Sequence, residues 1–183
     1  MILILFGVSG AGKTTVGHLL SSRLGWCFED SDDLHSVANR RKMESGTPLT
    51  DEDREPWLKV PHLRMQEFIK CDRNAVLACS ALKQKYRDLL VAGFEPDQVR
   101  FALLDAPRAL LEERIRKRHH EYMNPCLLDS QLAALEAPAD TWRISVRRTE
   151  EEAVQQLLGQ VKIVTEYGLK PQLRTEQNAD NQH

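Results

Sequence analysis

The stretch that most constrains this 183-residue chain is Gly7-Val8-Ser9-Gly10-Ala11-Gly12-Lys13-Thr14. It matches the pattern G-x-x-x-x-G-K-[ST] of a phosphate-binding loop at every fixed position. The apolar run Met1 to Phe6 precedes it, and residues 15–24 carry valine and leucine at helical spacing. The pattern therefore predicts a strand, a tight turn and a helix whose N-terminus binds the phosphates of a nucleoside triphosphate.

Each part of this loop has an expected role toward ATP and Mg²⁺. Glycines let backbone N–H groups approach phosphate oxygens without interference from a Cβ atom. Lys13 would reach the β- and γ-phosphates and stabilise their charge during transfer, and the Thr14 hydroxyl would bind Mg²⁺. The residues expected to bind the nucleotide are Gly7, Ser9, Gly10, Ala11, Gly12, Lys13, Thr14 and Thr15.

Composition narrows the possible partners and the location. The 25 Lys and Arg residues nearly balance the 27 Asp and Glu residues, so no global basic field favours nucleic acid or a membrane surface. The apolar run before Gly7 is too short for a signal peptide or a membrane span. The four cysteines are scattered without C-x-x-C spacing, which favours reduced thiols. We expect a cytoplasmic protein that binds neither nucleic acid nor membranes.

Apolar runs that alternate with helical patterns predict an α/β fold with a parallel sheet. One domain is expected over residues 1–167, followed by a disordered polar tail at 168–183. Strands are expected at residues 1–6, 26–30, 75–79, 99–104 and 142–146. Helices are expected at residues 15–24, 36–44, 50–71, 80–92, 107–118, 127–135 and 149–164. Thr50 and Ser80 would cap their helices, Pro61 would kink or interrupt the third, and Glu112/Arg116 and Glu113/Lys117 would pair.

Two carboxylates follow the second strand at the edge where ligands bind in open α/β sheets. Asp30 and Asp32 are two residues apart and would face the same side. We expect Asp30 to hold Mg²⁺ through a water molecule and Asp32 to accept a proton from an attacking hydroxyl. The alternative is that both acids only make a surface loop soluble.

Several cations indicate an anionic substrate. Lys83 and Arg87 are four residues apart and would share a helix face, and Arg54 lies in the first turns of another helix. Each alone is more simply a solvated surface charge, but together they would bind a carboxylate. Arg114 and Arg118 would close on the phosphates and stabilise charge in the transfer. The adjacent His119 and His120 do not complete a metal site.

Beyond the loop, the sequence resembles the gluconate kinases, which are small P-loop sugar-acid kinases, from the N-terminus to about Val164. The resemblance depends on blocks spread along the chain. These are residues 30–35 (DSDDLH), Asn39 with Lys42-Met43, 46–58 (GTPLTDEDREPWL), 78–83 (ACSALK), 86–88 (YRD), 127–131 (LLDSQ) and 135–138 (LEAP).

The resemblance implies a shikimate-kinase-like fold with a five-stranded parallel sheet flanked by helices and a mobile lid at about residues 119–126. It also implies ATP, Mg²⁺, transfer to the 6-hydroxyl of D-gluconate and a homodimer. Asp32, His35, Arg54, Lys83 and Arg87 would lie near the sugar acid, and Arg114 and Arg118 on the lid side. One departure is that His120-Glu121-Tyr122 stands where the family usually has Gly-His-Phe.

Two other functions remain compatible with parts of the sequence. A kinase of another small anionic acceptor, such as shikimate or a different aldonic acid, would use the same loop and cations. A nucleotide-operated switch without turnover is the alternative from another class. A GTPase switch would carry Asn-Lys-x-Asp for guanine, which this chain lacks.

Overall fold

The computed structural model describes residues 1–117, 125–139, 141–147 and 149–167. Its centre is a five-stranded sheet in the order β2-β3-β1-β4-β5, and every neighbouring pair is parallel. The α/β prediction is confirmed. The strands are β1 (Ile2–Phe6), β2 (Cys27–Asp30), β3 (Ala75–Ala78), β4 (Val99–Asp105) and β5 (Trp142–Ser145).

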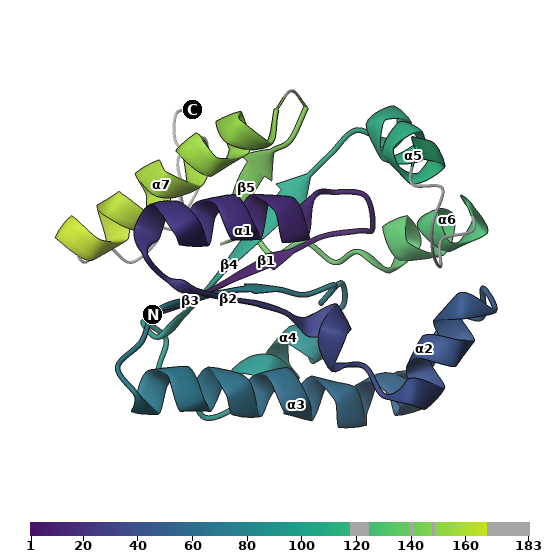
Figure 1. The fold of residues 1–183 in the computed structure, drawn as a ribbon, viewed down its shortest axis with the longest axis horizontal. Coiled ribbons are helices and arrows are strands. Elements are labelled where there is room, and N and C mark those ends of the chain that lie inside the picture. The colour runs from purple at the N-terminus through teal and green to yellow at the C-terminus, as the bar shows by residue number, and fades with distance from the viewer. Residues whose placement is uncertain (118–124, 140, 148, 168–183) are drawn as a thin grey trace, which may run out of the picture.

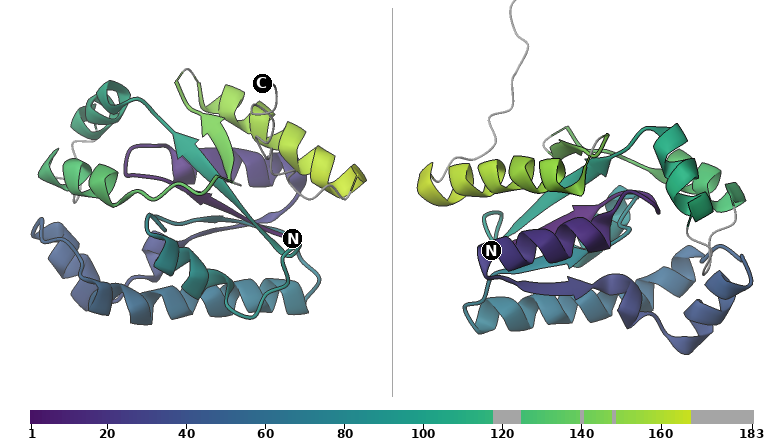
Figure 2. Two further views of the ribbon diagram at one scale, coloured as in Figure 1. Left: turned by 180° about the vertical axis from the view of Figure 1, so that it is seen from behind. Right: turned by 45° about the horizontal axis from the view of Figure 1, so that its top comes forward.

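Helices cover both faces of the sheet (Figure 1). On one face lie α1 (Lys13–Leu24) and α7 (Glu150–Tyr167), and on the other lie α3 (Asp51–Lys70) and α4 (Gln84–Val91). The remaining helices, α2 (Val37–Glu44), α5 (Arg108–Lys117) and α6 (Pro125–Ala134), lie beyond the carboxyl ends of the strands (Figures 1 and 2). A short 3₁₀ helix, η1 (Ser31–Leu34), follows β2 directly.

The alternation of side chains along β1 separates two hydrophobic cores. Leu3 and Leu5 pack with α1 and α7, whereas Ile2 and Ile4 pack with α3 and α4. All four side chains are fully buried. Because successive side chains of a strand point to opposite faces, one apolar strand anchors both helical layers.

Helix α1 lies unusually close to the edge strand β2. A Cβ atom added at Gly17 would lie 2.3 Å from the Phe28 ring, so only glycine leaves room for that ring. The close approach brings the first turn of α1 beside the end of β2. Thr14 and Asp30 are thereby placed in contact, with the Thr14 hydroxyl donating to Asp30 Oδ2 at 2.6 Å.

The termini of the elements confirm some local expectations and correct others. Gly25 ends α1 in the left-handed conformation, and Thr50 with Asp53 forms the expected capping box of α3. Pro61 does not interrupt α3, which is continuous over 20 residues. The buried side chains of Trp57, Leu58, Met65 and Phe68 hold this helix against the sheet on both sides of the proline.

Two other expectations were wrong. Ser80 does not cap α4, because its carbonyl accepts from Leu82 N–H at 2.8 Å in a tight turn, and the helix begins after Lys83. Glu112 pairs with Arg108 at 2.7 Å rather than with Arg116, whereas the expected Glu113–Lys117 pair is present at 2.6 Å.

Other expectations fall on residues outside the described ranges. These are the disordered tail at 168–183 and most of the lid at 119–126. The last two residues of the expected lid belong to α6, which begins at Pro125. Cys27, Cys71 and Cys79 are free thiols, and the side chain of Cys126, the fourth cysteine expected to be reduced, lies outside the described residues. Within the described parts of the chain, no helix combines the length and the apolar composition needed to cross a bilayer.

Candidate active site

The phosphate loop owes its shape to glycines with positive φ. Gly7, Gly10 and Gly12 have φ of 144°, 81° and 91°, a region that residues with a side chain rarely adopt. A Cβ atom at Gly10 would lie 3.3 Å from Ile115, and one at Gly12 would lie 3.4 Å from Arg114 Nη1. The loop is therefore a cradle that only glycines leave open, and its residues fit the phosphates of ATP.

Lys13 lies across this cradle. Its ammonium group donates to the carbonyl oxygens of Gly7 at 3.0 Å and Val8 at 3.3 Å, and the residue is buried. Because Lys13 is the first residue of α1, its charge adds to the positive end of the helix dipole. This is the position from which a lysine can contact the β- and γ-phosphates.

Two residues from outside the loop contact it. Arg114 of α5 places Nη1 3.4 Å from the Gly10 carbonyl oxygen, and its Nη2 pairs with Glu150 at 3.0 Å. Gln131 of α6 accepts from Ser9 N–H at 2.7 Å and donates to Ser9 Oγ at 3.2 Å. Helices α5 and α6, which flank the expected lid in sequence, are thus both attached to the loop. Arg118 lies outside the described residues.

The Thr14–Asp30 contact is suited to a magnesium ion. Hydroxyl and carboxylate oxygens are ligands that Mg²⁺ prefers, either directly or through its water molecules. A cavity of about 500 Å³ borders both residues and also reaches Asp33, so solvent has access to the pair. The residues present therefore fit the ion.

Asp32 lies in η1, directly after Asp30. Its N–H donates to Asp30 Oδ1 at 3.0 Å, and its side chain is 58% exposed. Protein atoms nevertheless crowd the carboxyl group, and partial loss of hydration raises the pKa of Asp32. Lys13 opposes this rise, and the negative charge of Asp30 adds to it. A carboxyl group with a raised pKa is a better proton acceptor than an ordinary aspartate.

His35 follows η1 and lies beside Asp32. Its side chain is only 3% exposed, and its Nε2 is 3.9 Å from Asp32 Oδ1. The ring stacks on Trp57 of α3, with centroids 4.0 Å apart and planes inclined by 15°. Burial, with the positive charges of Arg54 and Arg40, lowers the pKa of His35 to about 4. The imidazole is therefore neutral at neutral pH.

Three cations surround the ring of Tyr86 on α4. Arg54, Lys83 and Lys85 lie 5.6, 5.6 and 5.7 Å from the ring centroid. The one carboxylate in this cluster is Asp51, which accepts from Lys83 at 3.2 Å and also from Lys85 and the Tyr86 hydroxyl. These contacts hold the pKa of Asp51 well below its usual range, and the hydrogen bond from Lys85 has the largest effect. The cluster keeps an excess of positive charge.

The position of Arg87 differs from the prediction that Lys83 and Arg87 present their charges on one helix face. Arg87 does not share an exposed face with Lys83, because its residue is only 1% exposed. Its guanidinium group donates to the carbonyl oxygens of Ala81 at 2.8 Å and Leu82 at 2.9 Å, and to Gln84 Oε1 at 2.8 Å. Arg87 therefore shapes the loop between β3 and α4 from beneath, while the Lys83 ammonium lies on its accessible side.

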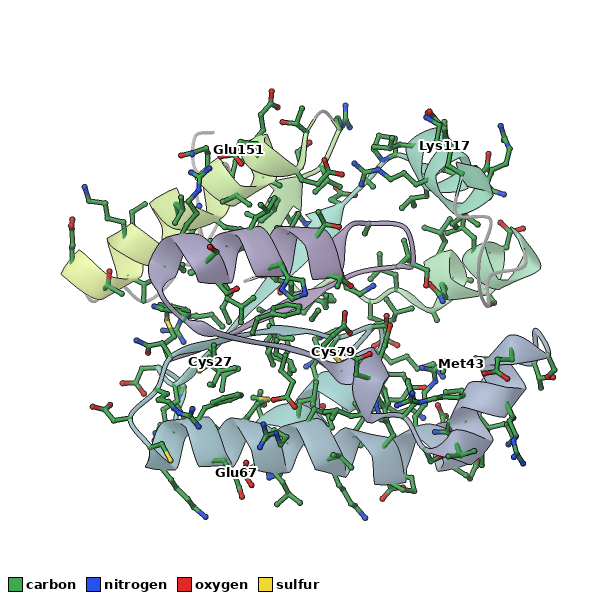
Figure 3. All side chains as sticks on the ribbon, in the orientation of Figure 1. Cys27, Met43, Glu67, Cys79, Lys117 and Glu151 are labelled. Atoms are coloured by element: carbon green, nitrogen blue, oxygen red, sulfur yellow. The ribbon has the colours of Figure 1, made fainter. Side chains whose placement is uncertain are left out.

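Both halves of the site lie at the carboxyl edge of the sheet, because the loop follows β1, η1 follows β2 and Lys83 follows β3. In Figure 3, Met43 marks α2 and Lys117 marks α5 at this end of the molecule, whereas Glu67 and Glu151 lie on the outer helical layers. One half, with the loop, Arg114 and Gln131, is suited to phosphates. The other half contains Asp32, His35, Arg54 and Lys83, a combination of carboxylate and cations that is suited to a small acid.

Comparison with known proteins agrees with this geometry. A family model described as an AAA domain matches residues 2–138. A gluconokinase from Gluconobacter oxydans is 46% identical over 138 residues, which are 75% of this chain and 76% of the relative. This chain belongs to the gluconokinase family. It is accordingly an enzyme, a kinase with a P-loop.

Solved structures support the same placement. The structure of a gluconokinase from Sinorhizobium meliloti has a TM-score of 0.76 and 34% identity, and the match covers 89% of this chain and 94% of that one. A shikimate kinase from Aquifex aeolicus, at 17% identity with a TM-score of 0.53 and coverage of 88% and 96%, shares the fold. The expected shikimate-kinase-like architecture is confirmed.

Sequence reasoning gave no role to four residues of the gluconokinase-type site. Asn39, Asp51, Tyr86 and Gln131 each make a contact that shapes it. All four lie inside the blocks that carry the family resemblance. The family resemblance therefore includes these residues, but no local sequence pattern predicts which residue each side chain contacts.

Proposed function

We propose that this chain transfers the γ-phosphoryl group of ATP to the 6-hydroxyl of D-gluconate, giving 6-phospho-D-gluconate and ADP. The observation that carries the proposal is the cation cluster of Arg54, Lys83 and Lys85, of which Arg54 also lies close enough to Asp32 and His35 to lower the pKa of His35 and to oppose the rise in that of Asp32. Relatives named gluconokinase support the choice of acid.

The acceptor would bind with its carboxylate toward the cation cluster. Asp51 cannot neutralise three cations, so Arg54 and Lys83 retain charge for a carboxylate. In gluconate the carboxylate and the 6-hydroxyl are at opposite ends of the carbon chain. Fixing the acid group at the cluster therefore presents the far hydroxyl to Asp32 and His35. Arg87 contributes by holding the carbonyl groups of the loop beneath Lys83.

The chemical step moves one phosphoryl group and one proton. The hydroxyl oxygen forms a bond to the γ-phosphorus while the bond from that phosphorus to the β–γ bridging oxygen breaks, and ADP leaves. Asp32 accepts the hydroxyl proton and later releases it to solvent. Lys13 stabilises the charge on the transferring group, and Arg114 of α5, with Arg118 on the lid side, would approach the phosphates.

Thr14 and Asp30 would hold the magnesium ion, Thr14 through its hydroxyl and Asp30 through a water molecule. When bound, the ion would supply positive charge that offsets the negative charge of the phosphates during the transfer. The chain's own contribution is the 2.6 Å contact that places the two oxygen ligands together before nucleotide arrives.

The remaining parts of the proposal concern organisation. Residues 1–167 would form the kinase domain, with the lid at about 119–126 and a disordered tail at 168–183. The resemblance further implies a homodimer, and the free thiols are consistent with the reducing cytoplasm. Light scattering after size-exclusion chromatography measures the oligomeric state directly.

ADP release from ATP and Mg²⁺ with a panel of acids tests the proposal. Gluconate should accelerate ADP release at least a hundredfold over shikimate and over other aldonic acids. Lys83→Met should raise the gluconate KM about tenfold and leave the ATP KM unchanged, because it removes a charge and keeps the aliphatic stem. Lys59→Met, on an exposed part of α3, is the matched control.

A preference for shikimate or another acid would mean that the residues at 120–122 change the acceptor. ADP release that no acid accelerates would instead favour a nucleotide-operated switch. Either result contradicts the proposal.

A further inference from the structure

The environment of His35 fixes the plane of its ring. The imidazole stacks on Trp57, and Trp57 is itself held by a hydrogen bond from its Nε1 to the Ser31 carbonyl oxygen at 2.8 Å. A neutral imidazole carries one N–H proton, and the fixed ring plane leaves open which of the two nitrogens holds it. Asn39 lies at the Nδ1 side of the ring, and Asp32 lies toward Nε2.

The side chain of Asn39 decides between the two tautomers. Asn39 is in the first turn of α2 and only 6% exposed. Its Nδ2 donates to the Asp53 carbonyl oxygen at 3.0 Å, and a carbonyl oxygen can only accept, so the orientation of the amide is defined. The same nitrogen lies 3.5 Å from His35 Nδ1. For this contact to be a hydrogen bond, Nδ1 must be the acceptor.

We propose that Asn39 is a positioning residue that holds His35 in the tautomer protonated at Nε2, so that the ring donates to the acceptor hydroxyl beside Asp32. The identity of that hydroxyl rests on the proposed function, but the tautomer does not. The 3.9 Å between His35 Nε2 and Asp32 Oδ1 is too long for a direct hydrogen bond. It is short enough for one hydroxyl oxygen to lie within hydrogen-bonding distance of both atoms.

Only this tautomer gives that hydroxyl a complementary pair of partners. A hydroxyl has one proton to donate, and Asp32 is the acceptor for it. If His35 Nε2 were unprotonated, it would compete with Asp32 for the same proton and leave the hydroxyl oxygen without a donor. With the proton on Nε2, the ring orients the oxygen while Asp32 takes the proton. The lowered pKa of His35 agrees with a neutral ring.

A long-range ¹H–¹⁵N correlation spectrum of the full-length protein with ¹⁵N-labelled histidine tests the tautomer without substrate. The six histidines are assigned by comparison with His35→Gln. We expect the His35 signals of the wild type to show a protonated Nε2 and an unprotonated Nδ1 at pH 7.5. A protonated Nδ1 in the wild type overturns the proposal, and this outcome needs no other variant.

Asn39→Asp tests the role of the amide. A carboxylate can only accept, so Nδ1 of His35 should become protonated, and gluconate kcat should fall about tenfold with the ATP KM unchanged. Asn74→Asp makes the same chemical change at an exposed position beside the N-terminus and should alter neither measurement. An Asn39→Asp variant that folds and keeps Nδ1 unprotonated, or keeps the wild-type kcat, contradicts the proposal.

The spectrum tests the tautomer and the kinetics test the acceptor, so the two proposals can be contradicted independently. If gluconate proves not to be the acceptor, the tautomer of the free protein still shows whether Asn39 sets it. If the tautomer differs while gluconate is phosphorylated, the proposed function stands without this role for Asn39.

Discussion

The phosphate loop and the acceptor-binding half of the site differ in what holds their polar groups in place. In the loop, eight consecutive residues bring backbone N–H groups together, and positive φ at Gly7, Gly10 and Gly12 defines their path. In the acceptor half, side chains from η1, α2, α3 and α4 position one another. The Asn39–Asp53 and Lys83–Asp51 contacts, for example, join residues 14 and 32 positions apart.

This difference has a consequence for mutation. A backbone cradle tolerates many side-chain changes outside its glycines, its lysine and its threonine. A network of side chains transmits each change to its neighbours, because every member is a partner of another. We therefore expect single changes in the loop to act on one chemical role, and changes at buried members of the acceptor half, such as His35 and Arg87, to alter stability as well.

The largest effect is expected at Lys13. Lys13→Ala should reduce phosphoryl transfer at least a thousandfold and leave the melting temperature nearly unchanged, since the loop path depends on glycines. Removing a group that stabilises the transferring phosphoryl takes away several kcal/mol of transition-state stabilisation, roughly 4 or more. Steady-state turnover and thermal melting measure the two quantities. Turnover near that of the wild type would remove the proposed mechanism.

Asp32→Asn should lower kcat by about 10²- to 10⁴-fold and change the gluconate KM little. The carboxamide keeps the shape and can still contact the hydroxyl, but it cannot accept the proton. Asp97→Asn, which makes the same chemical change at an exposed position before β4, is the matched control. If only KM changed in Asp32→Asn, Asp32 would be a binding residue and not the base.

Arg87→Met should lower the stability of the protein by about 3 kcal/mol, or roughly 6–12 °C in melting temperature. Its guanidinium group donates to two buried carbonyl oxygens, and the variant leaves them without this donor. Because this loop carries Lys83, gluconate binding should weaken as well. A variant with wild-type stability and weaker gluconate binding would show instead that Arg87 contacts the substrate directly.

The smallest effect concerns pH. The pKa of His35 is about 4 in the folded protein and about 6.5 when unfolded, so between these values the unfolded state binds one more proton. Stability should therefore fall as the pH drops below 6.5, by about 2 kcal/mol at pH 5. Urea unfolding at pH 7.5 and 5 should show this loss reduced in His35→Gln. An equal loss in both proteins would contradict the buried neutral imidazole.

The same contrast explains what the sequence could predict. The loop, the order of strands and helices and the Thr50 capping box follow from patterns within ten or so residues, and the structure confirms them. The burial of Arg87 could not be predicted in this way, because it depends on the path of residues 80–83. Nor could the continuity of α3 through Pro61, which the packing of Trp57 and Met65 against the sheet maintains.

Of the residues that would contact the acceptor, spacing and charge indicated Asp32, Arg54 and Lys83, whereas His35 was named from the family resemblance alone. Spacing places Asp30 and Asp32 on the correct edge, but it does not show that His35 stacks on Trp57 or that Asn39 faces the ring. Those contacts form only when α2 and α3 pack beside η1.

The position of the phosphate on the product shows which hydroxyl of the acceptor reacts. In the proposed binding mode, the carboxylate of gluconate lies at Arg54 and Lys83 and its far hydroxyl lies at Asp32. A ³¹P–¹H correlation spectrum of the product formed from ATP and gluconate should therefore connect the new phosphorus signal to the two protons on carbon 6. A phosphorus signal connected to any other carbon position, or inorganic phosphate as the only new signal, would contradict it.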